Sequence, residues 1–544
     1  MLRRIPRFAK CMALGGIGFS AIYNMDNRTE AKLLQRSLRT FYNGLILAVD
    51  YKLYGGDIQQ LPALHERVAN RMFNVFEKNG GLYIKIGQVI AAQSAILPTA
   101  YQRRAKSLLD SAPEVALSSI EQVFLEDYGT LPQDLFTDFD PHPVASASIA
   151  QVHKAVLPSG QVVAVKVQKP AVQKQIGWDL YALRALLHLY EYIFELPLTF
   201  TADYIEQHIR KEVDFENEAR NGQRSRHHLE QQSQLEGKVY IPKVYPEYST
   251  RRVLVCEWVD GVQLTDMEKI TALGLDYKEA MKISIEAFSS QIFISGFVHG
   301  DPHAGNVLVA PHPKNKKKVQ VILVDHGLYV QESEKFRIQY CKLWQALFML
   351  DLKTMTEICS EWGIHDVNMF ASIILQKPFV ENKAVHLQQT SLQDIYEFQS
   401  GVKERLKHFL EDQQQFPQEL IFLLRNMEIV RANNKTVGSP VNRLNIMARW
   451  AVRGIDDYDE EANRYHHHRL GLQHQLRATW RRFIFSFNLF LMSLGFWLVK
   501  LRQNTSRILF GTKIPGFEEL LDQRMKEQMY LQYGIQIDEN VFDA

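Results

Sequence analysis

The sequence is poor in cysteine and carries almost no net charge, and both scarcities exclude classes of protein. Its 63 lysines and arginines nearly balance its 61 aspartates and glutamates, for a net charge of +2 over 544 residues, so no nucleic-acid surface is expected. The four cysteines have neither the spacing of a zinc site nor that of a disulfide framework; they are Cys11, Cys256, Cys341 and Cys359. The length predicts several domains, and we find no internal repeat.

Two polar motifs near the middle of the chain are its most informative feature. The first is His299-Gly-Asp-Pro-His-Ala-Gly-Asn306, and the second is Val324-Asp-His-Gly327. Asp301 and Asn306 have the spacing of the H-R-D-x-x-x-x-N catalytic loop of protein kinases, and Asp325 stands in the place of the D-F-G aspartate. Phosphoryl transfer needs these groups, because one carboxylate handles the attacking hydroxyl while an amide and a second carboxylate hold Mg²⁺.

A third motif, Val163-Ala-Val-Lys166, precedes both and matches the kinase strand whose lysine binds the phosphates. Taken singly, each motif could be an ordinary turn or an edge strand with a solvated lysine. Together they occur in kinase order, and the apolar runs 162–167 and 319–324 are predicted strands beside them. The combination predicts a two-lobed, protein-kinase-like fold of the α+β class.

The glycine-rich loop that covers ATP in ordinary kinases is absent. At its expected place the chain reads Val144-Ala-Ser-Ala-Ser-Ile-Ala-Gln-Val-His153, without a glycine. Backbone N–H groups can still face phosphates here, but a Cβ resists positive φ and keeps the backbone further away. We therefore expect the nucleotide to be held in a different way, by Ala145, Ser146, Ala147 and Ser148. The alternative is the plain start of an apolar strand.

Three acidic residues lie where the partner of the kinase lysine is expected. A helical pattern over 204–221 carries Glu212, Asp214 and Glu218, after an insertion at 177–201 with apolar residues at helical spacing. On one continuous helix Asp214 and Glu218 share a face, and Glu212 points elsewhere. Two directions indicate two roles, although a merely solvated helix is also compatible with the pattern.

The Ala-Pro-Glu that follows the D-F-G motif in protein kinases is also absent. Soon after Gly327 the chain enters an apolar helical pattern at 336–350. Because the platform that seats a protein substrate is missing, the sequence argues against an ordinary protein kinase.

These motifs and departures resemble the UbiB family, the aarF-domain-containing kinase-like (ADCK) proteins. Lys85-Ile-Gly-Gln88 matches the family's K-x-G-Q motif, Ala145–Ala150 its alanine-rich loop, and Glu212-Val-Asp214 its E-x-D motif. The stretch His299–Asn306 matches H-x-D-P-H-x-G-N. The resemblance covers roughly residues 65–440 and is closest to the mitochondrial subgroup of aarF-domain-containing kinase one.

The resemblance implies nucleotide chemistry, with ATP or ADP and Mg²⁺ as cofactors. Lys166, paired with Glu218, would contact the α- and β-phosphates. Asn306 and Asp325 would hold the metal, and Asp301 would orient or deprotonate the attacking group, most plausibly water. Family members of this kind bind nucleotide, hydrolyse ATP weakly, and are tied to coenzyme Q and mitochondrial lipid handling.

The resemblance also implies a cover over the site where a kinase would admit a protein substrate. The K-x-G-Q helices would form it, with Lys85 meeting Glu212 and Asp214, and with Gln88 beside them. Without the resemblance, Lys85 would be interpreted as a lysine that extends from an apolar helix to solvent.

Both ends of the chain have the composition of targeting or membrane segments. Four basic residues precede the first acid, Asp26, and the run 11–23 is uncharged and largely apolar. This predicts a mitochondrial presequence and a short membrane segment, with residues 1–10 in the matrix and the body in the intermembrane space. Near the other end, the uncharged run 483–499 either enters a membrane or packs on the kinase core.

The sequence thus predicts five regions: a presequence and membrane segment at 1–30, a helical K-x-G-Q extension at 31–140, an N-lobe at 141–258, a C-lobe at 259–440 and a helical C-terminal extension at 441–544. We expect an atypical kinase-like ATPase of the mitochondrial inner membrane, acting in coenzyme Q distribution and lipid homeostasis. Its expected partners are membrane lipid or coenzyme Q pathway components, and a homodimer is one arrangement open to it. The rivals are a kinase for a lipid, a small molecule or a protein, and a nucleotide-binding pseudokinase scaffold.

Overall fold

The computed structural model describes residues 23–27, 29, 31–57, 60–91, 99–106, 114–195, 199–364, 367–375, 417–466, 472–510 and 514–524. Within these ranges some side chains, including that of Gln88, are not described. Of the expected presequence and membrane segment at 1–30, residues 1–22, 28 and 30 lie outside the described residues, and so does the apolar run 11–23 except for Tyr23. The chain forms two compact units, which we call the N-terminal unit (Met1–Glu216 with Tyr245–Trp258) and the C-terminal unit (Asn217–Val244 with Val259–Ala544).

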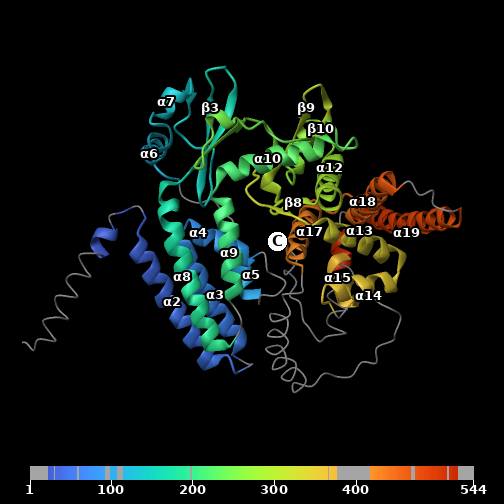
Figure 1. Cartoon of the computed structure of the whole chain (residues 1–544), viewed down its shortest axis with the longest axis horizontal. Helices are drawn as coiled ribbons and strands as arrows, with labels where there is room; N and C mark the ends of the chain where they lie inside the picture. The colour runs from blue at the N-terminus through green and yellow to red at the C-terminus, as the bar shows by residue number, and fades with distance from the viewer. Residues whose placement is uncertain are drawn as a thin grey trace, which may run out of the picture. The chain divides into compact units, whose positions relative to one another are not determined.

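Helices form one part of the N-terminal unit (Figure 1). They are α2 (Leu33–Tyr54), α3 (Leu61–Asn79), α4 (Leu82–Ala91), α5 (Thr99–Lys106), α8 (Pro170–Phe194) and α9 (Thr199–Glu212). Helix α2 packs against α3 and α8, and the short α4 contacts α3, α8 and α9. A buried ion pair between Arg36 on α2 and Asp179 on α8 ties two of these helices together. The guanidinium of Arg36 also lies 5.3 Å from the ring centroid of Tyr83, which places α4 in the same bundle.

An antiparallel sheet forms the other part of this unit. Its strands are β1 (Asp138–Phe139), β2 (Ala145–Ser146), β3 (Ala150–Val156), β4 (Val162–Gln168) and β6 (Val253–Glu257), in the order β1-β3-β4-β6 with β2 beside β3. On β4, Val163, Val165 and Val167 are fully buried in a core that includes α6 (Leu117–Tyr128). Because side chains alternate along a strand, Lys166 points to the opposite face of the sheet.

The C-terminal unit combines two small sheets with a large helical core. The strands are β5 (Val239–Tyr240), β7 (Val262–Gln263), β8 (Phe297–His299), β9 (Val307–His312), β10 (Asn315–Leu323) and β11 (Tyr329–Gln331). One sheet has the order β5-β10-β9-β7, and β8 pairs with β11 in the other. The pairing of His299 with Tyr329 brings the strand that follows the second polar motif beside the strand that leads into the first.

The helices of the C-terminal unit bury a core rich in aromatic residues. They are α10 (Phe215–Glu230), which starts in the other unit, then α11 (Met267–Ala272), α12 (Tyr277–Ser290), α13 (Glu334–Met349), α14 (Leu352–Glu361), α15 (Val367–Leu375), α17 (Gln418–Thr436), α18 (Arg443–His466) and α19 (Leu472–Phe510). Phe293 stacks on Tyr340 and meets Trp344 edge to face, and all three are buried. Helix α13 accounts for the apolar pattern expected at 336–350.

The expected continuous helix over 204–221 is wrong. Helix α9 ends at Glu212, and α10 begins at Phe215, so Asp214 lies between two helices. Hydrogen bonds from elsewhere in the fold replace the helical ones at this break. Gln168 Nε2 donates to Val213 O at 2.9 Å. The Phe215 N–H donates to Arg251 O at 3.1 Å. The argument that Asp214 and Glu218 share one helical face therefore fails.

Candidate functional site

The catalytic-loop motif is built around His299, a buried residue at the end of β8. The Asp301 N–H donates to His299 Nδ1 at 3.0 Å, so this nitrogen is an acceptor. The other ring nitrogen, Nε2, then carries the proton and donates to Asp325 O at 2.9 Å. Burial lowers the pKa of His299 below its usual value, which keeps the ring neutral and suits one donor and one acceptor. One neutral histidine thus joins the two motifs.

The amide and the second carboxylate are fixed by neighbouring backbone bonds. Asn306 is buried, and its Nδ2 donates to Asp301 O at 3.1 Å. The Val324 N–H donates to Asn306 O at 2.9 Å, which brings the chain entering Asp325 against the catalytic loop. Asp325 itself has a φ of +61°, a region that residues other than glycine seldom occupy. The fold therefore holds Asp325 in a conformation that an unconstrained loop would seldom adopt.

Helix α17 supplies a second layer of support that no local motif indicated. Arg425 Nη2 lies 3.3 Å from Asp301 Oδ1 and forms an ion pair with it. Asn426 Nδ2 donates to His299 O at 2.7 Å, and Asn433 Nδ2 donates to Pro302 O at 2.9 Å. More than a hundred residues separate α17 from the loop that it orients, which is why the sequence pattern could not reveal the contacts.

The donor set around the two motifs suits a hard cation held together with phosphates. Carboxylate and amide oxygens are ligands that Mg²⁺ accepts, and it commonly takes only one or two from the protein. Among the described residues there is no group of three or more His, Cys, Asp and Glu that could hold a metal ion. Asn306 and Asp325 supply an amide and a carboxylate, two kinds of ligand that fit a Mg²⁺ bound together with phosphates.

Glu218 lies in the C-terminal unit, near the second motif. It is 3% exposed, and its Oε1 accepts a hydrogen bond from the His326 N–H at 3.4 Å. Asn221, one turn further along α10, donates through Nδ2 to His326 O at 3.0 Å. These contacts fix Glu218 next to the Asp-His-Gly turn. Its expected pairing with Lys166 stays a prediction.

Lys166 lies on β4 of the N-terminal unit, beside residues that sequence reasoning missed. Its Nζ is 5.2 Å from the ring centroid of Phe215, a cation–π contact. Two residues along, the buried Gln168 makes the bond to Val213 O that was described above. Gln168 thus connects the end of the lysine strand to the E-x-D segment. The sequence carried a faint signal for this, since an amide follows the lysine in an otherwise apolar strand.

The alanine-rich loop is also held by an unexpected residue. Ala145 and Ser146 form β2, and Lys169 Nζ donates to Ala147 O at 2.6 Å. Burial lowers the pKa of Lys169 to about 8. The Oγ of Ser148 is buried and makes no hydrogen bond in the structure. Because a buried polar atom normally has a partner, this hydroxyl is suited to donate to a ligand oxygen.

The K-x-G-Q motif lies on α4, and Lys85 forms an ion pair with Glu212 at the end of α9. The side chains are 20% and 24% exposed, respectively. Tyr83, two residues before Lys85, is buried and its hydroxyl accepts from Thr40 Oγ1 at 2.8 Å, which anchors α4 in the bundle. The contact between the motif's lysine and an E-x-D acid is therefore present, and it is made by Glu212. Only the backbone of Gln88 is described.

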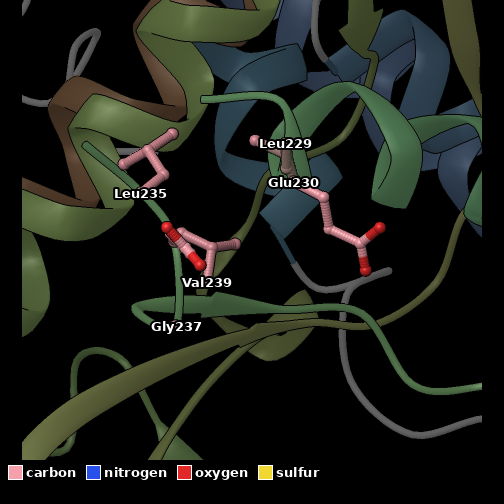
Figure 2. Close-up of a pocket in the computed structure, with 6 residues that line it drawn as sticks. Leu229, Glu230, Leu235, Gly237 and Val239 are labelled. Carbon is pink, nitrogen blue, oxygen red and sulfur yellow. The ribbon is translucent and has the colours of Figure 1, made fainter. Parts of the chain in front are cut away.

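The pocket in Figure 2 is separate from these residues. It encloses about 150 Å³ and is lined by residues 229, 230, 235–237 and 239 of the C-terminal unit. The carboxylate of Glu230 points away from Leu235 and Val239 in this view. The pocket contains none of the expected site residues, and we assign it no role.

The chain is similar to a group of proteins with a kinase-like domain. Residues 107–359 match the ABC1 atypical kinase-like domain. An ABC1 family protein of Schizosaccharomyces pombe is 42% identical, over 81% of this chain and 82% of that protein. An ABC1 family protein of Purpureocillium lilacinum is 37% identical, over 77% of this chain and 78% of that protein. AarF domain-containing protein kinase 1 of Gallus gallus is 32% identical, over 80% of this chain and 85% of that protein. These matches confirm the kinase-like fold that the motifs predict.

Proposed function

Because this chain belongs to the ABC1 atypical kinase-like family, we propose that it is an ATP-hydrolysing enzyme of the mitochondrial inner membrane, active in coenzyme Q distribution and lipid homeostasis. One observation supports the chemistry above all others. His299 joins the loop of Asp301 to the loop of Asp325, because its ring accepts a hydrogen bond from the Asp301 N–H and donates one to Asp325 O. This arrangement presents an amide and two carboxylates on a buried frame, as metal-assisted phosphoryl transfer requires.

Each group of the C-terminal unit has one role in the proposal. Asn306 and Asp325 hold Mg²⁺, which neutralises phosphate charge when it is bound with the nucleotide. Asp301 orients the attacking group and accepts its proton, and the ion pair with Arg425 fixes the carboxylate. Water is the proposed acceptor, because no Ala-Pro-Glu follows Asp325-His-Gly327, where protein kinases carry one.

The N-terminal unit supplies the phosphate contacts and the cover. Lys166, with Glu218 as its partner, contacts the α- and β-phosphates, and Ala145–Ser148 lies along them with the Ser148 hydroxyl as a donor. Lys85, Glu212, Asp214 and Gln88 form the cover that keeps a protein substrate out. The ion pair between Lys85 and Glu212 supports this part of the proposal.

The proposed location rests on composition at the N-terminus. Four basic residues precede an uncharged, largely apolar run, as in a mitochondrial presequence followed by a short anchor. In this interpretation the folded part of the protein lies in the intermembrane space, where its partners are membrane lipid and coenzyme Q pathway components.

Phosphate release from MgATP by the full-length chain tests the proposal. We expect slow hydrolysis that rises with lipid vesicles or a coenzyme Q head-group analogue, and that stops when EDTA removes Mg²⁺. The matched control is Asp301→Asn, which keeps the side-chain shape but removes the proton acceptor. Hydrolysis no faster than that of Asp301→Asn under every condition would reject the enzyme. If Asp301→Asn still binds MgATP and restores growth of a strain that lacks the protein, a pseudokinase scaffold is the better account.

A further inference from the structure

One face of α19 exposes a row of large apolar side chains. Six of them, each between 43% and 61% exposed, are Phe487, Phe490, Leu494, Trp497, Leu498 and Leu501. At 100° per residue they lie within an arc of about 100° and extend over roughly 21 Å of helix. A contiguous apolar surface of this kind is uncommon on a soluble protein and marks a site of interaction.

The opposite face of the same helix is fixed to the C-terminal unit. Phe485 and Leu489 are buried there. Helix α19 lies against α13 and α18 (Figure 1). Asn488 Nδ2 donates to Phe348 O at 2.8 Å, and Lys500 Nζ donates to Gly438 O at 3.0 Å. The helix is thus held at both ends of the apolar row.

These contacts decide between two ways in which α19 could meet a bilayer. By length and composition, Phe483–Ser506 could cross a membrane, with a mean hydropathy of 1.7. A helix that spans a bilayer, however, is surrounded on all sides by lipid or by other spanning helices. Instead, the hydrogen bonds of Asn488 and Lys500 hold one side of α19 against the C-terminal unit. The arrangement fits a helix that lies along the surface of the bilayer with one face inserted.

The charge of the segment around the apolar row indicates which kind of bilayer surface it binds. From residue 462 to residue 517 the chain has nine lysines and arginines and no aspartate or glutamate. Arg481 and Arg482 precede the apolar row, and Arg502 lies at its far end. Basic residues beside an inserted apolar face attract anionic headgroups. A second copy of this face would bring the same positive ends together in either orientation, which is unfavourable.

We infer that the exposed face of α19 docks the protein onto an anionic lipid bilayer, with the helix lying flat in the interface. Docking gives the enzyme direct access to molecules dissolved in that bilayer. The inference rests on the membrane part of the proposed function and is independent of the nucleotide chemistry.

Flotation of the full-length chain with vesicles tests the inference. The vesicles contain phosphatidylcholine, with or without phosphatidylglycerol, and binding is compared at low and high salt. We expect binding that needs phosphatidylglycerol and weakens as salt rises. Leu494→Glu combined with Phe487→Glu should weaken it by at least about tenfold, because charged groups replace inserted apolar ones.

The matched control is Leu273→Glu, since Leu273 and Leu494 are both 43% exposed in the same unit. It should bind as the unchanged chain does. Equal binding by the double variant would overturn the inference. So would a lipid-free dimer, seen by sedimentation equilibrium, that the double variant converts to monomer, because the face would then serve a second copy. MgATP affinity measured without vesicles separates the two proposals. If the unchanged chain does not bind MgATP, the nucleotide site is rejected and the docking inference is unaffected. If the double variant loses vesicle binding but keeps normal MgATP affinity, docking is confirmed as a property separate from nucleotide binding.

Discussion

The catalytic loop of the C-terminal unit and the K-x-G-Q contact of the N-terminal unit are held by different kinds of interaction. His299 and Asn426 are 2% and 0% exposed, and they connect the loop through short hydrogen bonds. Lys85 and Glu212 are 20% and 24% exposed and are joined by an ion pair. A buried hydrogen-bond network is costly to disturb, whereas an ion pair in contact with solvent contributes little. The backbone of the catalytic loop is therefore the fixed region, and the K-x-G-Q contact is the region that can yield.

The strongest test of the fixed region is Asp325→Asn. Asparagine tolerates positive φ and keeps the shape of the side chain, so the fold should persist. The metal, however, loses its charged ligand, and we expect MgATP affinity to fall by about a hundredfold or more. Titration calorimetry measures the affinity, and thermal unfolding without nucleotide is the control. Unchanged affinity would remove Asp325 from the metal site.

A second change separates positioning from binding within the same region. Arg425→Gln removes the ion pair with Asp301 but leaves Asn306 and Asp325 in place. We expect kcat for ATP hydrolysis to fall by roughly tenfold while MgATP affinity is retained, because Asp301 acts on the acceptor. Lys435→Gln is the control, since Lys435 lies on the same helix but pairs with Asp522. A drop in kcat of equal size in both variants would assign Arg425 a structural role only.

Changes to the K-x-G-Q contact should alter ATP hydrolysis less than changes to the catalytic loop do, and the effects of its two residues should be coupled. Lys85→Ala and Glu212→Gln each break the same ion pair, so either change alone should alter the rate of ATP hydrolysis by a few-fold. The double variant should alter it by no more than either single variant does. Stability should change by less than about 1 kcal/mol. Arg103→Ala, which removes an ion pair with Glu66 in the same unit, is the matched control. Additive effects of the two changes would show that Lys85 and Glu212 act separately.

The smallest effect is expected in the alanine-rich loop. Ala145→Gly or Ala147→Gly lets the backbone approach the phosphates more closely, and this should shift the preference between ADP and ATP by about twofold to fivefold. Lys169 continues to hold Ala147 O, so the fold should change little. Thermal shifts with each nucleotide provide the measurement. Shifts that match the unchanged chain in both variants would mean that the loop does not face the nucleotide.

Local spacing in the sequence explains why much of the site could be predicted. Asp301, Asn306 and Asp325 belong to motifs a few residues long, and the strands next to them contain buried valines. Lys85 and Glu212 could be paired only through a family resemblance, because more than a hundred residues separate them.

Other contacts had no local signal. Arg425 and Asn426 reach the catalytic loop from α17, and neither belongs to a motif. The break between α9 and α10 is caused by bonds from Gln168 and Arg251, which override a sequence that favours helix. Tertiary hydrogen bonds of this kind are invisible to periodicity, and they account for the one element that was predicted wrongly.

The fate of the terminal phosphate of ATP tests the central claim most directly. The full-length chain is incubated with γ-labelled MgATP, anionic vesicles and a mitochondrial lipid extract, and the label is followed in inorganic phosphate, lipid and protein. The account predicts label in inorganic phosphate, at a rate that Asp301→Asn abolishes. Label that accumulates instead on a lipid or on a protein, and that also depends on Asp301, would contradict hydrolysis and identify a kinase.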